Sequence, residues 1–294
     1  MELPSFYNKD NVSKLYKVNY SKIRGELFDK KIDIDRKKNA LVLIACQNEF
    51  INSDSDIIEI LDFIYSNIEE IDEIFVPMIS HPYVSIFSPI FWLDRTGKTI
   101  KEGSEISVGG VLRGDFHINH LISRNFSMND NLFKKAVIGY LESVEKIGKK
   151  LIVKNFPVSF GSLNFAIIPS IEEAIFSHSI MHRKQPHINF AGPNPFSEFK
   201  SVFVPDMADF IPGNDIIFSS NLGVIRKISL YDNVIFASLS EEISINSICD
   251  FVKSFGNCKS IYSNHKSLNG GKMQKCSNIV SEDIVCCKLS NISI

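Results

Sequence analysis

The sequence predicts a three-layer α/β/α sandwich built around a mostly parallel β-sheet. With 294 residues, of which 44% are hydrophobic, the chain is large enough to bury the core of such a domain. Short apolar runs of strand length alternate along it with segments whose apolar residues recur at helical spacing. The first strong run, residues 39–46, is apolar almost throughout, as is typical of a strand covered on both faces.

The chain divides into an arm, a domain and an insertion within that domain. Residues 1–38 are polar and mildly basic, which indicates an N-terminal arm laid over the domain. The domain itself is expected over residues 39–294. An insertion at about residues 80–130, rich in Gly, Ser and Pro, interrupts its strand–helix alternation.

Each strand is predicted from an apolar run and each helix from apolar residues on one face. The helix at 54–70 follows Ser53 or Asp54 as its N-cap, and the helix at 131–147 is closed by Gly148. The strands are expected at 39–46, 74–79, 150–155, 201–205, 233–239, 260–263 and 283–289, and further helices at 241–255 and within 163–182.

Composition excludes several classes of protein. The 32 Lys and Arg residues against 34 Asp and Glu give a net charge of −2, unlike a protein that mainly grips nucleic acid. We expect nucleic-acid contact only within a larger complex, through the basic residues 36–38. No apolar run reaches the about 18–20 residues of a membrane span. The six cysteines are scattered without a CxxC pair, which is typical of reduced thiols, so we expect a cytoplasmic protein.

The carboxyl ends of the predicted strands are where a ligand should bind. In open parallel sheets, ligands lie beyond these ends, near the point where the strand order reverses. The segments to examine are therefore those that follow the apolar runs, at residues 45–50, 80–82, 156–162, 191–196 and 240–243.

Several short motifs in these segments occur in the order of a known family. Residues 47–50 read Gln-Asn-Glu-Phe, and His81 with Pro82 follows the second strand. Further matching segments come later in the chain, at residues 88–97, at residues 194–198 and at the Asn246-Ser247 pair. In this order the chain resembles the isochorismatase-like cysteine hydrolases, which include the nicotinamidases. The resemblance covers roughly residues 39–265 and implies the isochorismatase-like hydrolase fold.

The chain departs from that family at the residues that do its chemistry. The resemblance implies a Cys nucleophile, an Asp that moves the proton and a Lys that lowers the thiol pKa. The matching positions hold Ile243, Ala45 and Ala191, which can neither attack a carbonyl nor accept a proton. We therefore expect no catalytic residues from this triad.

The family's metal site is incomplete as well. Where that site is present, the resemblance implies an Asp and two His ligands, and the matching positions are Ile79, His81 and Ser85. One imidazole does not make a metal site, so no metal or other cofactor is expected. His117 with His120, and His178 with His182, also lack a completing ligand, and we interpret them as ordinary surface or loop histidines.

These departures lead to the hypothesis of a pseudoenzyme. The chain would be a catalytically inactive member of the family that acts as a structural, binding or regulatory subunit. Its expected partners are another protein or a second copy of itself, since many members of this fold self-associate. The residues expected to line the old pocket are Phe50, His81, Trp92 and Glu242.

Two alternatives stay open at this point. The first is an amidase that works with non-standard residues such as Cys46 or Glu242. Cys46 should point away from Ala45 into the core, however, and Cys249 lies too far along the last helix to replace the nucleophile. The second is a binder of a small aromatic, nicotinamide-like ring, with Trp92 and Phe50 as stacking surfaces.

Overall fold

The computed structural model describes most of the chain. The described residues are 3–28, 38–124, 129–146, 148–155, 158–191, 196, 200–204, 222–254, 260–264, 284–286, 289 and 292.

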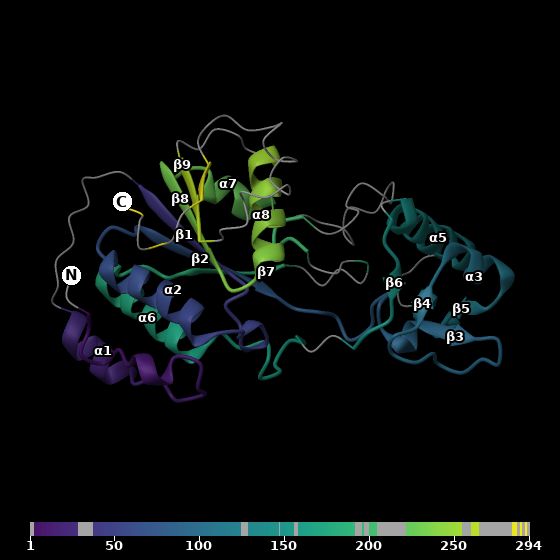
Figure 1. The fold of residues 1–294 in the computed structure, drawn as a ribbon, viewed down its shortest axis with the longest axis horizontal. Helices are drawn as coiled ribbons and strands as arrows, with labels where there is room; N and C mark the ends of the chain where they lie inside the picture. Colours follow the sequence, from purple (N-terminus) through teal and green to yellow (C-terminus); the bar gives the residue numbers. More distant parts are fainter. Residues whose placement is uncertain are drawn as a thin grey trace.

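A parallel sheet forms the centre of the larger part of the molecule. Within the described residues it has six strands in the order β10-β9-β8-β1-β2-β7, and every adjacent pair is parallel. This topology, with helices on both faces, confirms the predicted three-layer α/β class (Figure 1). The strands are β1 (Asn39–Ile44), β2 (Glu73–Ile79), β7 (His187–Ala191), β8 (Asn233–Ser238), β9 (Ser260–Ser263) and β10 (Ile284–Cys286).

Strand β1 is buried on both of its faces. Leu41 and Leu43 belong to one apolar cluster, and Ala40, Val42 and Ile44 belong to another. Helices α2 (Asp54–Ser66) and α6 (Pro169–His182) cover the first face. Helices α7 (Leu222–Ile228) and α8 (Glu241–Ser254) cover the second (Figure 1). The apolar run of β1 is therefore explained by two helical layers, as the sequence predicts.

The described part of the N-terminal arm lies against the first helical layer. It contains the short 3-10 helix η1 (Lys9–Asn11) and helix α1 (Tyr20–Leu27), which packs beside α6 (Figure 1). Val12 and Ile23 are fully buried in the same cluster as β1, and the Ser170 hydroxyl donates to the Val12 carbonyl at 2.7 Å. The arm thus contributes apolar residues to the core.

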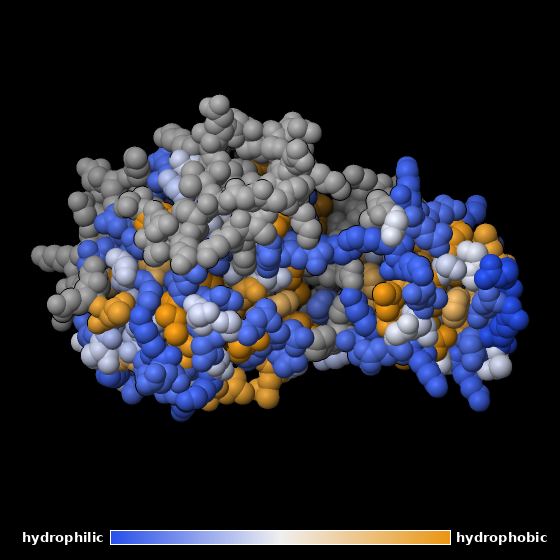
Figure 2. Space-filling view, viewed as in Figure 1, coloured by the Kyte–Doolittle hydropathy of each residue, from blue (hydrophilic) through white to orange (hydrophobic). Residues whose placement is uncertain are grey.

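A smaller lobe with its own core follows strand β2. Its cluster of buried residues runs from Ile86 to Val153 and includes Trp92, with Phe196 joining from later in the chain. Its elements are the 3-10 helix η3 (Pro89–Phe91), the paired strands β3 (Trp92–Asp94) with β5 (Phe116–Ile118) and β4 (Glu105–Ile106) with β6 (Leu151–Ile152), and helices α3 (Val108–Arg113), α4 (His120–Ser123) and α5 (Asp130–Lys146). On its visible face apolar side chains are scattered among hydrophilic ones (Figure 2).

The expectation that the helix at 131–147 and the strand at 150–155 join the main sandwich is wrong. They are α5 and β6, and β6 pairs antiparallel with β4 inside the lobe. The second core therefore continues past residue 130, beyond the insertion that the sequence indicates. Apolar spacing predicts that a helix or strand forms, but it does not say which core the element joins.

The sequence does not indicate strand β7, and its prediction of a strand at residues 201–205 is not met by the described residues 201–204. Strand β7 was not expected, because Ile188 and Phe190 are exposed on this edge strand and alternate with polar residues. Residues 201–204, expected to be a strand, form no strand although Val202 and Phe203 are buried. The Val202 N–H donates to the Ser247 hydroxyl at 3.0 Å instead of to a neighbouring strand.

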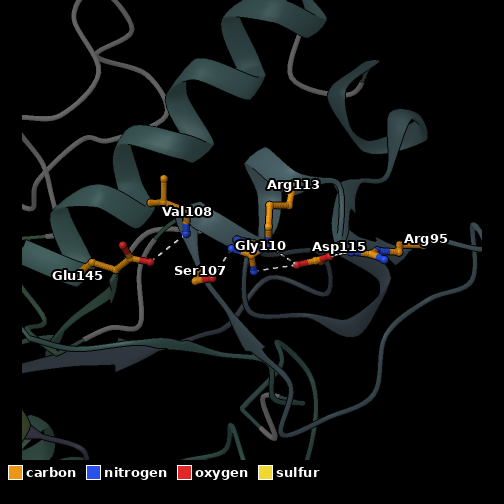
Figure 3. Close-up of polar contacts among 7 residues, drawn as sticks. All are labelled: Arg95, Ser107, Val108, Gly110, Arg113, Asp115 and Glu145. Carbon is orange, nitrogen blue, oxygen red and sulfur yellow. Dashed lines mark hydrogen bonds and ion pairs between the residues drawn. The ribbon is translucent and has the colours of Figure 1, made fainter.

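Helix α3 contains Gly109 and Gly110, which the sequence indicates as a turn. Ser107 caps the helix by accepting from the Gly110 N–H at 3.0 Å, and Glu145 accepts from the Val108 N–H at 2.8 Å (Figure 3). Just beyond the helix, Asp115 pairs with Arg113 at 2.8 Å and also with Arg95 (Figure 3). A Cβ on Gly110 would lie 2.8 Å from the Phe116 ring, so the ring packs where a side chain is missing.

The two glycines of α3 should therefore respond differently to alanine. Gly110→Ala is expected to lower the free energy of unfolding by about 1–3 kcal/mol, because the Phe116 ring must move. Gly109→Ala should be neutral or stabilising by up to about 1 kcal/mol, because its Cβ would meet only the exposed, flexible Arg113 side chain. Urea unfolding of both variants checks this, and equal losses of stability would contradict it.

A buried carboxyl group lies on α6 beneath the arm. Glu173 is only 6% exposed. Burial raises the pKa of Glu173 to about 7, and the charge of Lys22 and the hydroxyl of Tyr16 offset part of that rise. Because the folded chain holds this proton more tightly than the unfolded chain, the free energy of unfolding that Glu173 contributes falls as pH rises from about 4.5 to 7.

Glu173→Gln should stabilise the protein at alkaline pH. At about pH 8 the gain in the free energy of unfolding is expected to be about 1–3 kcal/mol, and at about pH 4.5 close to zero. Urea unfolding at both pH values measures this difference. The neighbouring half-buried Glu172, as Glu172→Gln, serves as the control and should change stability by less than about 0.5 kcal/mol at either pH. A Glu173→Gln gain that is equal at both pH values would contradict the assignment.

Candidate functional site

The strand order of the sheet reverses beside β1. From β1 the chain moves to β2 on one side, and β8 lies on the other side, followed outward by β9. The carboxyl ends of β1 and β8, where α8 begins, are therefore the place where such folds bind ligands, and we call this place the crevice. The lobe follows β2 on this same side of the sheet (Figure 1).

The structure brings the departures from the family pattern together at this crevice. Ala45, Ile79 and Ala191 follow or end three neighbouring strands, and each is at most 4% exposed. All three belong to the apolar cluster on the α7/α8 face, and Ile243 and Phe50 pack against that cluster. The positions that the resemblance assigns to a proton acceptor, a metal ligand, a lysine and a nucleophile thus lie in or against one buried apolar cluster.

Ala45 keeps an unusual backbone conformation. Its φ is +54°, in the left-handed region that residues with a Cβ rarely adopt. Such a conformation costs on the order of 1 kcal/mol and is found mainly where the surrounding structure imposes it, often at functional sites. Here it turns the chain at the end of β1 around a methyl side chain.

Cys46 points to the opposite face of the sheet, as the sequence predicts. It is 2% exposed and belongs to the cluster on the α2/α6 face, whereas Ala45 belongs to the other cluster. Burial raises the pKa of its thiol far above the ordinary value. A protonated thiol in an apolar core is a poor nucleophile, so Cys46 does not supply the chemistry that Ile243 lacks.

Cys249 corrects the expectation of reduced thiols. It is half-buried on α8 and is disulfide-bonded, so it holds no free thiol in this state. Disulfides persist mainly in oxidising compartments. This bond weighs against the cytoplasmic location that the scattered cysteines indicate, which stays a prediction.

Gln47 ties the ends of two strands to the segment before α6. Its side-chain amide donates to the Ile79 carbonyl at 2.9 Å and to the Phe165 carbonyl at 2.8 Å. Its Oε1 accepts from the Ile79 N–H at 2.8 Å. Gln47 is 1% exposed, so these bonds satisfy an amide that water does not reach. The sequence signal for this role is an amide side chain directly after a buried strand.

The next residues of the motif hold the same segment. The Asn48 side chain donates to the Leu163 carbonyl at 2.8 Å. Glu49 accepts from the Asn164 side chain at 2.8 Å, and burial raises the pKa of its carboxyl group. The Gln-Asn-Glu-Phe motif therefore acts here as a structural clamp, and Phe50 packs against both apolar clusters.

The other residues expected in the pocket lie in different surroundings. His81, just beyond β2, is 8% exposed, and its backbone N–H donates to the Val158 carbonyl at 2.6 Å. Glu242 is exposed in the first turn of α8. The placement of Trp92 in the pocket is wrong, because Trp92 is fully buried in the lobe core and its ring N–H donates to the Ile86 carbonyl at 2.6 Å. Residues 192–195 of the expected loop lie outside the described residues.

The histidine pair on α6 is part of the packing between α6 and the segment before β2. His178 and His182 stack with ring centroids 4.0 Å apart and contact the carbonyls of Ile71 and Ile68, each at 2.7 Å. Burial, followed by the neighbouring His182, lowers the pKa of His178 to about 3, so it is a neutral core residue and not a surface histidine. Over the described ranges no three His, Cys, Asp or Glu side chains are placed to hold a metal ion.

Comparisons with known proteins agree with this architecture. No protein-family model and no curated protein matches the sequence. Among solved structures, yeast nicotinamidase Pnc1p bound to the inhibitor nicotinaldehyde is similar, with a TM-score of 0.51 and 11% identity, covering 85% of this chain and 100% of that chain. The Acinetobacter baumanii nicotinamidase/pyrazinamidase is similar with a TM-score of 0.50 and 11% identity, covering 87% and 99%. The chain has a nicotinamidase fold.

The nicotinamidase fold is thus retained across 85% of the chain at 11% identity to that yeast enzyme. At this identity the likeness concerns the arrangement of the backbone and carries no residue roles with it. None of the described helices combines the length and hydropathy that a bilayer crossing requires.

Replacing Gln47 should destabilise the nicotinamidase fold strongly. Gln47→Leu is expected to lower the free energy of unfolding by about 2–5 kcal/mol, because the Ile79 N–H and two carbonyls lose their partner in a buried place. Glu49→Gln keeps an acceptor for Asn164 and is the control, with an expected change below about 1 kcal/mol. Urea unfolding measures both, and a Gln47→Leu loss no larger than the control would contradict the clamp.

Proposed function

We propose that this chain is a catalytically inactive protein of nicotinamidase fold that works as a binding or regulatory subunit. The observation that carries the proposal is the buried apolar cluster at the crevice, where Ala45, Ala191 and Ile243 stand at the positions of the three groups that the resemblance requires. Methyl and butyl groups neither transfer protons nor attack a carbonyl carbon.

Loss of the charged groups also fits the energetics of the crevice. An Asp, a Lys and a thiolate at these positions would have to be removed from water, which costs several kcal/mol per ion unless they are well paired. Apolar residues avoid that cost, and they relax a conflict between stability and function that active sites commonly carry. The sequence at this crevice is therefore suited to a stable scaffold.

An amidase that works with other residues has less support. Cys46 is buried on the far side of the sheet with a raised thiol pKa, and Glu242 is exposed to solvent. Leu112, Leu121 and Leu132 of the lobe are exposed, and a protein partner or a second copy of the chain would remove such side chains from water. We propose that this subunit acts in the cytoplasm, where the Cys249 disulfide would be reduced.

The direct test is amide hydrolysis by the purified chain. We expect ammonia release from nicotinamide to stay at the level of the buffer blank, with the yeast nicotinamidase Pnc1p as the positive control for the assay. The Ala45→Asp/Ala191→Lys/Ile243→Cys variant is a second test, since activity in it alone would locate the loss at these positions. Turnover by the unmodified chain that disappears in Cys46→Ala or Glu242→Ala would contradict the proposal and favour the amidase.

A further inference from the structure

A cavity lies at the opposite end of the sheet from the crevice, at the amino ends of the strands. It has a volume of about 450 Å³ and is formed where β1, β2 and β7 begin and α7 ends. Lys38 precedes β1, His187 begins β7, and Lys227 lies in the last turn of α7. Neither the family resemblance nor the nicotinamidase comparison refers to this end of the sheet.

The floor of this cavity is aromatic and well packed. The buried Phe75 ring lies between two other rings of the lining. It stacks on His187 with centroids 4.6 Å apart and planes inclined by 19°, and Tyr231 meets it edge-on at 5.8 Å. His187 and Tyr231 are only partly buried, so they present flat surfaces to the cavity. Such a floor favours a planar ring as ligand.

The charges around the cavity favour an anion. Its two acidic residues are already engaged, because Asp72 accepts from the Asn39 N–H at 2.7 Å, and Glu73 pairs with His187 and lies 3.5 Å from Lys184. Lys38 and Lys227 are exposed, and among the described residues neither ammonium group has a carboxylate within ion-pair distance. Two lysines at one rim attract a group with two negative charges more strongly than either does alone.

We propose that this cavity binds a planar aromatic compound that carries a phosphate group, of the size of a nucleoside monophosphate. The ring lies on the floor that His187 and Tyr231 form, and the phosphate lies between Lys38 and Lys227. A volume of about 450 Å³ is within the range of sites that enclose ligands of this size. The site is independent of the crevice and of whether the chain hydrolyses amides.

The test is calorimetric titration of the full chain with adenosine monophosphate. We expect one saturable site whose affinity falls as salt is raised, because the phosphate contacts are charged. Adenosine and inorganic phosphate, titrated separately, should each bind at least about tenfold more weakly than the nucleotide. Lys38→Gln and Lys227→Gln should each weaken binding about tenfold, whereas Lys98→Gln, an exposed lysine of the lobe, should leave it unchanged.

Three outcomes would overturn the proposal. The first is the absence of saturable binding up to about 5 mM nucleotide. The second is equal affinity in the Lys38→Gln, Lys227→Gln and unmodified chains. The third is equal affinity for the nucleotide and for benzoate, an aromatic anion without a phosphate group. Thermal unfolding of each variant shows that it is folded, and the salt dependence is measured on the unmodified chain, so a poorly folded variant does not decide the result. Because the assay reads binding and not hydrolysis, its failure would leave the proposed loss of catalysis untouched.

Discussion

The burial of β1 between two helical layers is the constraint on which the rest of the structure depends. Its residues pair with β2 on one edge and with β8 on the other, and alternate residues belong to the two apolar clusters. A strand buried in this way cannot shift by one residue without exchanging its two faces. It therefore fixes where the chain must leave the sheet, at Ala45, and where the neighbouring strands end.

Around that exit the molecule combines a left-handed turn and a buried amide clamp with the apolar side chains of a core. Ala45 retains a positive φ, and Gln47 still joins β1 to β2 and to the segment before α6. Amide hydrogen bonds in a buried place are costly to lose. Charged groups at this place would have to be removed from water, which costs several kcal/mol per ion unless they are well paired. The clamp therefore stabilises the exit from β1 without help from charged groups beside it.

The elements that the sequence predicts well are those whose burial is visible in their own residues. Strands β1, β2 and β8 and helices α2 and α8 carry apolar residues in the pattern that their cores require. Strand β7 could not be found in this way, because Ile188 and Phe190 are exposed at the sheet edge. The prediction that Trp92 lines the pocket is wrong, because the position of Trp92 after His81 in the sequence does not show that the chain has already entered the lobe.

The two ends of the sheet differ in the electrostatics that a ligand would meet. At the carboxyl end, α8 presents its N-terminus, whose partial positive charge favours anions without help from side chains. At the amino end, α7 presents its C-terminus, whose partial negative charge repels them. An anion there needs cations on side chains, and Lys38, Lys184 and Lys227 gather around the cavity. Part of the charge of Lys227 offsets the end of its own helix, and the carboxylate of Asp232 accepts from the backbone N–H of Lys38 at 3.3 Å, so the two lysines must act together on an anion.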